Sequence, residues 1–148
     1  MPFRFSLQTL LRFRQSVERQ WELRLQEANQ QVIEVEREIE TVQQRKAELA
    51  RYELRQLSQG VAGAQLHFHT LVRSRLAERR EVLQRELARR REARADCLCQ
   101  LQVAHREREA VDALRESQLR IYRQEASRRE QRRLDDLFLL RRDYLSRR

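Results

Sequence analysis

Hydrophobic residues in the first third of the chain recur at alternating intervals of three and four. In chain order the repeat is Leu25, Ala28, Val32, Val35, Ile39, Val42, Lys46 and Leu49. This spacing gathers side chains on one stripe of an α-helix, as in a coiled coil. Extended toward the N-terminus, the repeat includes Trp21, Leu11 and Leu7, with Arg14 and Glu18 as polar members. The pattern predicts a long amphipathic helix over about residues 6–58.

A second repeat with the same spacing runs over residues 72–114. Its members are Val72, Leu76, Arg80, Leu83, Leu87, Arg90, Arg94, Cys97, Leu101, Ala104, Arg108, Val111 and Leu114. Four members are arginines, whose aliphatic stems can cover an apolar seam while the guanidinium reaches water. The repeat predicts a second helix over about residues 65–145.

The chain offers a single place to reverse direction. Gly60 and Gly63 are its only glycines, and Pro2 is its only proline. Gly and Pro cost roughly 1 and 3 kcal/mol in a helix interior, so their absence elsewhere permits very long helices. We therefore expect a turn at residues 59–64. The fold class predicted is all-α: one antiparallel two-helix coiled-coil hairpin over residues 1–148.

The position of the turn fixes which residues face each other. If the chain reverses near residue 61, Leu49 lies opposite Val72, and Trp21 lies opposite Leu101. The two repeats meet in this register although each was identified from its own part of the sequence. Residue 3 then falls near residue 119, so the second helix is expected to continue well past the end of its partner.

The overhanging helix carries an apolar stripe. Leu134, Leu137, Phe138 and Tyr144 share one helical face, which Arg132, Arg133, Arg141 and Arg142 border. An unpaired apolar stripe of this kind favours docking into another protein. A helix that bends back, or a homodimer through residues 120–148, would also bury the stripe, and both alternatives stay open.

Composition supports helices and adds a positive charge. Charged residues make up 37% of the chain and aromatic residues 6%, and the formal net charge is +9. Residues 73–94 contain nine arginines and four glutamates. Such a basic stripe raises a nucleic-acid-binding or ribosome-binding alternative. No aromatic side chains interleave the arginines to stack on bases, which favours a solvated helix face instead.

Residue patterns for catalysis or metal binding are missing from the sequence. His67 and His69 point apart on a helix, with no acidic or Cys ligand expected nearby. Asp135 and Asp136 are adjacent and therefore diverge, unlike a catalytic carboxylate pair. We expect a non-enzyme without cofactor or metal. No apolar run is long enough to span a membrane, and the sparse cysteines favour a reducing, cytoplasmic setting.

Both ends of the chain resemble a known family. The opening Phe3-Arg4-Phe5-Ser6-Leu7-Gln8-Thr9-Leu10-Leu11-Arg12-Phe13-Arg14 resembles the start of FliJ proteins, the soluble coiled-coil component of the bacterial flagellar type III export apparatus. The segment Glu130-Gln131-Arg132-Arg133-Leu134-Asp135-Asp136 resembles that family's closing motif. Chain length, hairpin form and a turn near residue 60 also agree. The related stalk proteins of virulence type III secretion systems have the same form and remain the second interpretation.

The resemblance implies a stalk that works through partners. FliJ hairpins are similar to the rotary ATP synthase gamma subunit. Their open end enters a hexameric export ATPase, and they also contact the cytosolic domain of the export-gate membrane protein and handle export chaperones. The implied location is cytoplasmic and peripheral at the inner membrane. Carried onto this chain, the ATPase-binding residues are Leu7, Leu11, Arg14, Arg132, Leu134, Asp135, Asp136, Leu137 and Phe138. The gate-binding residues are Arg45, Leu49, Tyr52, Val72, Leu76 and Arg79.

Overall fold

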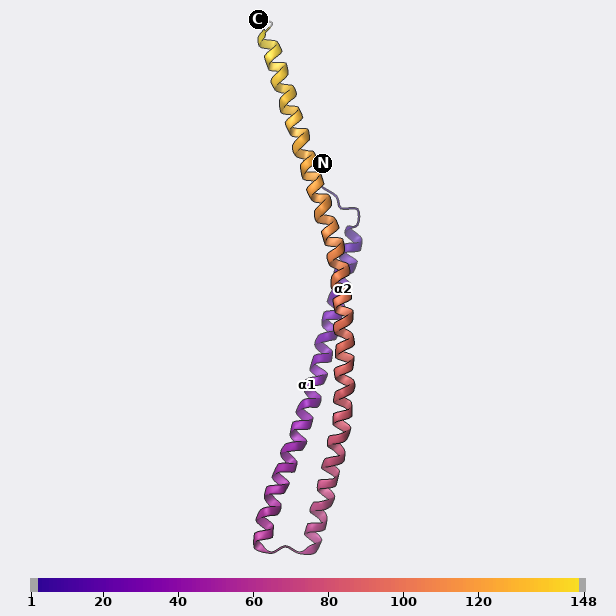
Figure 1. Ribbon diagram of the computed structural model, residues 1–148, viewed down its shortest axis with the longest axis vertical. Coiled ribbons are helices and arrows are strands. Elements are labelled where there is room, and N and C mark those ends of the chain that lie inside the picture. The colour runs from indigo at the N-terminus through magenta and orange to yellow at the C-terminus, as the bar shows by residue number, and fades with distance from the viewer. Residues whose placement is uncertain (1–2, 147–148) are drawn as a thin grey trace. The chain divides into compact units, whose positions relative to one another are not determined.

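A computed structural model of the chain describes residues 3–146 and contains two long helices joined by a short turn (Figure 1). Helix α1 spans Gln8–Gln59, and helix α2 spans Gly63–Ser146. No strand occurs among the residues described. The all-α helical hairpin expected from the two hydrophobic repeats is therefore confirmed.

The helix ends differ slightly from the predicted bounds. The first helical hydrogen bond of α1 runs from the Leu11 amide to the Leu7 carbonyl, at 3.0 Å, so α1 begins two residues later than expected. It ends where Gly60 adopts a φ of 85°, a left-handed conformation that glycine accepts without steric cost. Helix α2 starts at Gly63, and the Ala62 carbonyl accepts a hydrogen bond from the Gln65 amide at 2.9 Å. The turn is thus only residues 60–62.

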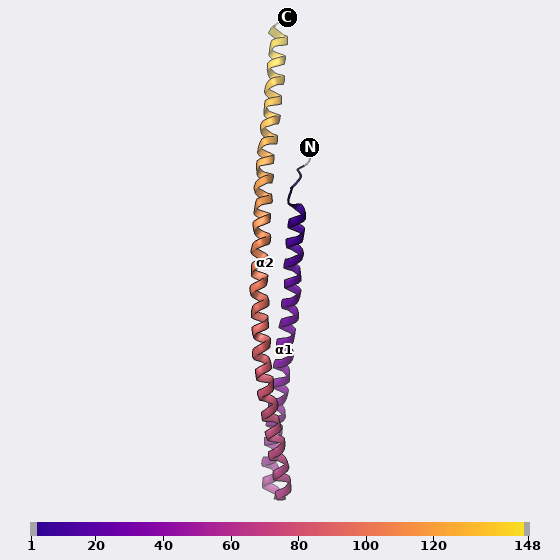
Figure 2. The ribbon, with the colours of Figure 1, turned by 90° about the vertical axis from the view of Figure 1, so that its right-hand side faces the viewer.

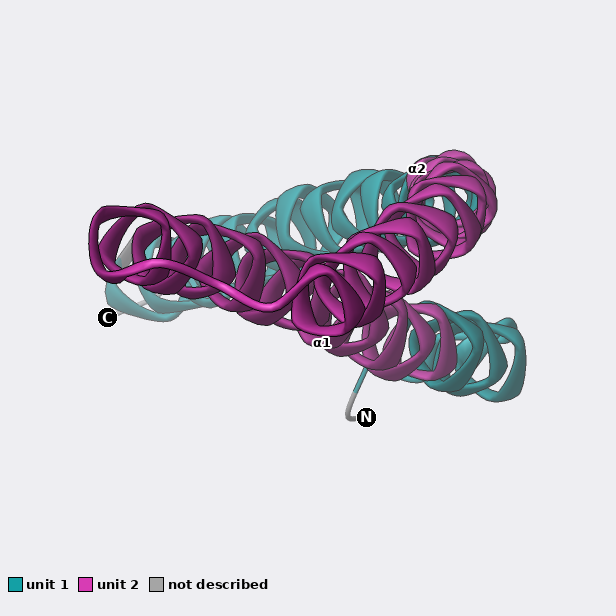
Figure 3. Cartoon of the chain, turned by 90° about the horizontal axis from the view of Figure 1, so that it is seen from below, with its two compact units in different colours: residues 1–18, 103–148 teal, residues 19–102 magenta. Residues whose placement is uncertain are grey.

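The chain divides into two compact units, and both helices contribute to each (Figure 3). Unit 1 contains residues 1–18 and 103–148, and unit 2 contains residues 19–102. Unit 2 therefore includes the turn. Unit 1 includes the start of α1 and the C-terminal half of α2.

The core of unit 2 is a seam between antiparallel helices. Val35, Val42 and Leu83 are buried there, and Ile39, Leu76 and Leu87 pack against them, partly buried. Polar contacts beside the seam agree with the predicted register. Arg79 forms an ion pair with Glu38 at 2.8 Å, and Arg90 donates a hydrogen bond to Gln31 at 2.7 Å. The facing residues thus stand at similar distances from the turn on the two helices.

Unit 1 repeats the arrangement with a shorter partner helix. Leu11 is 2% exposed, and Phe5 and Ala104 are also buried. Arg14 pairs with Glu107 across the two helices. The rings of Phe3 and Tyr122 lie 5.6 Å apart, about one helical turn from the position that the predicted register gives. Unit 1 therefore keeps the same antiparallel register.

Four predicted seam members lie outside the core. Leu7, Lys46 and Arg94 are exposed, and Leu114 is 43% exposed. Beyond Val111 the half-buried residues of α2 are Asp112, Gln118, Leu119 and Tyr122. The alternation of four and three from Val111 reaches residues 115, 118 and 122, of which Arg115 is exposed, and Leu114 falls outside it. Helix geometry, not the residue type, sets which side chains face the partner, so placing Leu114 in the seam was wrong.

Candidate docking surfaces

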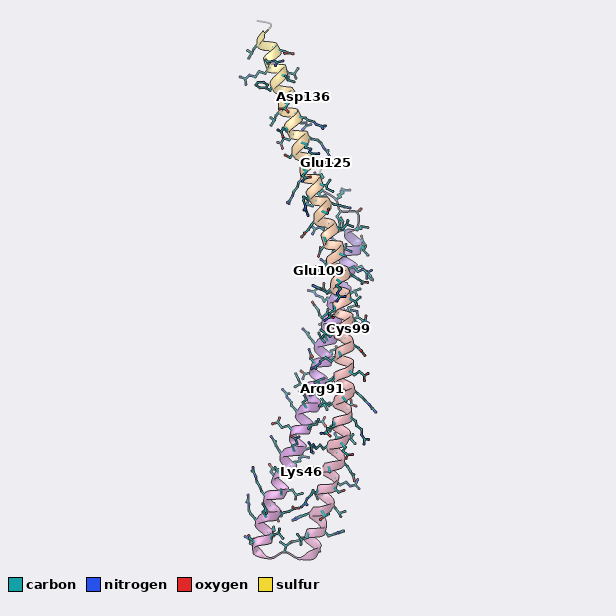
Figure 4. The ribbon with its side chains drawn as sticks, viewed as in Figure 1. Lys46, Arg91, Cys99, Glu109, Glu125 and Asp136 are labelled. Atoms are coloured by element: carbon teal, nitrogen blue, oxygen red, sulfur yellow. The ribbon has the colours of Figure 1, made fainter. Side chains whose placement is uncertain are left out.

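Within unit 1, α2 continues past its pairing with the start of α1. Every residue from 123 to 145 is exposed. Figure 2 shows this part of α2 running beyond the N-terminal end of α1, and Figure 4 labels Glu125 and Asp136 on it. We call residues 123–145 the overhang. The unpaired extension predicted from the off-centre turn is present.

The overhang carries apolar residues on one helical face, where Arg141 separates Phe138 from Leu145. Leu134, Leu137 and Phe138 are 61%, 62% and 68% exposed. Tyr144 and Leu145 extend the same helical face by two further turns and are also mostly exposed. A helix usually turns such a stripe toward a partner. The stripe is therefore the strongest candidate for a docking surface in unit 1.

Charged residues surround this stripe. Asp135 and Asp136 are exposed and leave the helix in different directions because they are adjacent. Arg132 and Arg133 are exposed one turn before Leu137, and the nearby Arg129 forms an ion pair with Glu125 at 3.2 Å. Six of the nine residues predicted to bind the ATPase thus lie on one stretch of α2. These are Arg132, Leu134, Asp135, Asp136, Leu137 and Phe138.

The three remaining predicted residues lie at the start of α1, in the paired part of unit 1. Leu7 is about one-third exposed, and Arg14 forms its ion pair with Glu107. Leu11 is buried between the helices, so its side chain is not available to a partner. Leu11 and Arg14 hold α1 on α2, whereas the overhang offers the accessible surface.

A polar network fixes this end of α1 against α2. Glu18 lies 2.6 Å from His105 Nδ1 and accepts a hydrogen bond from Arg108, which also donates to Asp112 at 2.7 Å. Burial alone raises the pKa of Glu18. The hydrogen bonds and positive charges of His105 and Arg108 together outweigh burial and lower that pKa. The hydrogen bonds with Asp112 and Glu18 raise the pKa of Arg108.

This network was only partly visible in the sequence. Glu18 was recognised as a polar member of the repeat, but nothing in the local pattern identified His105 as its partner. Arg108 was expected to send its guanidinium to water, and that expectation was wrong because Glu18 and Asp112 hold it. A polar group at one seam position favours a single register over its alternatives.

The residues predicted to bind the export gate divide into two groups in unit 2. Leu49, Val72 and Leu76 are half-buried and face the opposite helix. Arg45 and Tyr52 are exposed, and Arg79 is exposed while paired with Glu38. The first group supports the seam, and the second lies on the surface.

Sequence reasoning missed the most accessible apolar residues near the turn. Leu54, Leu57, Leu66, Phe68 and Leu71 are exposed in unit 2. They fall outside the repeat, and the repeat was the signal used to find apolar residues. The uncharged composition of the segment around the turn was the available signal.

His69 was also misjudged. It is 8% exposed, its ring lies 5.5 Å from that of Tyr52, and Nδ1 is 3.9 Å from the Glu53 carboxylate. The expectation of no acidic side chain nearby was wrong, because the turn brings Glu53 opposite His69. The alternation of four and three continued past Leu49 reaches Glu53 and would have shown this. Across residues 3–146, no three metal-binding side chains gather.

The basic stripe of α2 in unit 2 is largely paired with acidic residues. Arg79 and Arg91 bind Glu38 and Glu36 of α1, each at 2.8 Å. Arg85 and Arg90 bind Glu81 and Glu86 one turn earlier on α2. Partial neutralisation leaves fewer cations to contact a phosphate backbone.

Comparisons with known proteins give one match. A family model described as the flagellar FliJ protein matches residues 3–144. Neither the curated proteins nor the solved structures that were compared gave a match. Within the described part of the chain, no helix combines the length and the apolar character needed to cross a membrane.

Proposed function

We propose, because the chain belongs to the FliJ family of flagellar export components, that its overhang seats in the central pore of the hexameric export ATPase. The family is a structural component of the export apparatus and is not known as an enzyme, so its contribution is to flagellar protein transport and motility. In this proposal the chain promotes assembly and activity of the ring and links it to the export gate.

The exposed stripe of Leu134, Leu137 and Phe138 is the observation that carries the proposal. These side chains leave apolar area in water that a partner would cover, and burying each is worth roughly 1.5–3 kcal/mol. A single helix with its side chains is about 10–12 Å across, which suits a narrow central pore better than a pair of helices does. The arginines beside the stripe would pair with acidic groups at the pore entrance.

The proposed gate-facing surface lies near the turn, in unit 2, and includes residues of both helices. Arg45, Tyr52 and Arg79 would contact the cytosolic domain of the gate protein, while Leu49, Val72 and Leu76 hold the helices beneath them. Export chaperones complete the proposed partners. The proposed location is the cytoplasmic side of the inner membrane, held there through those partners. The proposed partners include no nucleic acid, because much of the basic stripe is already paired with acidic residues.

Binding of purified full-length variants to the export ATPase tests the proposal. Leu134→Asp and Phe138→Asp each place a charge in the stripe and should abolish binding, while the far-UV circular dichroism signal stays nearly unchanged. Leu57→Asp and Phe68→Asp are matched controls because those side chains are similarly exposed near the turn, at 58% and 62%. The controls should retain binding. Unchanged affinity in both overhang variants would remove the overhang from the mechanism.

A further inference from the structure

The end of unit 2 that contains the turn is free of formal charge. Residues 56–72 include no Asp, Glu, Lys or Arg, in a chain that is 37% charged. We call this segment the tip. Leu57, Leu66, Phe68 and Leu71 of the tip are exposed, with exposed fractions between 40% and 62%. The tip is therefore an uncharged, partly apolar end in an otherwise highly charged molecule.

The apolar side chains of the tip leave in several directions. Leu66 and Phe68 are two residues apart on α2 and so project about 200° apart around the helix axis. Leu57 comes from α1, on the other side of the turn (Figure 3, in which unit 2 is seen from the turn end). A groove on one protein surface covers a single face. A lipid interface surrounds whatever enters it, so the scatter favours lipid.

Several polar groups of the tip already donate to nearby backbone carbonyls. The Ser58 hydroxyl donates to the Arg55 carbonyl at 2.7 Å, and the Thr70 hydroxyl donates to the Leu66 carbonyl at 2.9 Å. The Gln65 and Leu66 amides, at the start of α2, both donate to the Ala62 carbonyl. Internal hydrogen bonds lower the cost of moving these groups out of water.

Basic residues follow the tip on both helices. Residues 45–55 and 73–80, which we call the collar, contain eight basic and three acidic residues. Arg51 and Arg55 are exposed, whereas Arg73 and Arg75 are exposed but form ion pairs with Glu53 and Glu78. Arg55 and Arg73 stand roughly 7 and 15 Å from the turn along their helices, at the 1.5 Å rise of each helical residue. Interfacial segments enter lipid to a depth of about 5–10 Å, so these cations would lie at or above headgroup level.

We propose that the tip inserts shallowly into the surface of a membrane containing anionic lipid. Leu57, Leu66 and Phe68 enter the boundary between headgroups and acyl chains, and Arg51 and Arg55 contact the anionic headgroups. This direct lipid contact goes beyond the proposed function, which places the chain at the membrane only through protein partners. It does not depend on ATPase binding.

Vesicle flotation of the purified full-length chain tests this inference. The chain should float with vesicles of phosphatidylethanolamine and phosphatidylglycerol, and much less with vesicles of phosphatidylcholine alone. Substituting Leu57→Ser and Phe68→Ser together should weaken binding about tenfold or more, because two apolar side chains no longer enter the interface. Arg51→Gln with Arg55→Gln should weaken binding to anionic vesicles specifically.

The matched control is Leu137→Ser with Phe138→Ser, which removes the same two residue types from equally exposed sites outside the tip. It should leave vesicle binding unchanged. Trp21→Phe with Phe68→Trp moves the single tryptophan of the chain into the tip. Its fluorescence should shift to shorter wavelength when anionic vesicles are added, because the indole enters the lipid interface. Absence of flotation, or equal loss in the tip and control variants, overturns the inference. The inference is also overturned if the parent chain does not bind vesicles and the tip variants lose binding to the isolated gate domain. That result would identify the tip as a protein-docking surface.

Discussion

The rings of Phe3 and Tyr122 lie 5.6 Å apart, and this pair marks the point in unit 1 where the N-terminal segment before α1 stops covering α2. On one side of the pair, Phe5 and Leu11 are buried. On the other, every residue from 123 to 145 is exposed. The unequal helix lengths therefore create a paired region that holds the N-terminal segment and a separate, exposed stretch of α2.

Stability of the paired region in unit 1 should depend on Leu11. Leu11→Ala removes a side chain that is 2% exposed and should lower the free energy of unfolding by about 2–3 kcal/mol. Leu10→Ala is the matched control, since Leu10 is 38% exposed, and should change it by less than about 0.5 kcal/mol. Chemical denaturation followed by circular dichroism measures both. Equal effects would show that the seam does not extend to this end of α1.

The Glu18 network predicts a loss of stability in acid. The folded chain holds the pKa of Glu18 below its ordinary value, so the unfolded chain binds a proton more readily. The stabilising contribution is complete above the ordinary glutamate pKa, about 4.3, and disappears as the pH falls through the lower folded value. At pH 7, Glu18→Gln should therefore be less stable than the parent chain. The difference between their free energies of unfolding should shrink as the pH falls below about 4.3.

The measurement is the free energy of unfolding of both chains from pH 7 to pH 3. Glu116→Gln serves as the control because Glu116 is exposed on α2. A difference between the parent chain and Glu18→Gln that stays constant over the whole range would contradict the assigned network.

Lys46 offers a stabilising substitution in unit 2. It occupies a position of the heptad repeat between Val42 and Leu49, yet it is exposed, while Leu76 on α2 is only partly buried. Lys46→Leu should add apolar contact there and raise the free energy of unfolding by about 1 kcal/mol. Arg45→Leu, one residue outside the seam, should leave it nearly unchanged. If Lys46→Leu does not raise the free energy of unfolding above that of Arg45→Leu, the side chain at position 46 does not pack against α2.

Much of the fold was predictable because helix geometry is regular. The alternating repeat located Val35, Val42 and Leu83 in the core, and the two glycines located the turn. The same off-centre turn predicted the overhang. These features need only a helical period and a point of reversal, and both can be read from one sequence.

Other features depend on contacts between distant residues. Glu18 meets His105, and Glu53 meets His69, only when the chain has folded back, so neither pair is a local pattern. Leu114 was misplaced because its residue type was given more weight than its position in the repeat. The exposed Leu57 and Phe68 lie outside the repeat, so the seam pattern does not predict them.

Site-specific photocrosslinking tests the central claim most directly. A photoreactive phenylalanine at position 138 places the probe on the stripe of the overhang, and the same residue at position 68 places it near the turn. The two native phenylalanines are similarly exposed, at 68% and 62%, so intrinsic reactivity is matched. With the purified hexameric export ATPase, the probe at position 138 should crosslink to residues lining the central pore, and the probe at position 68 should not. Crosslinking of the ATPase from position 68 alone, or from neither position, would contradict the account.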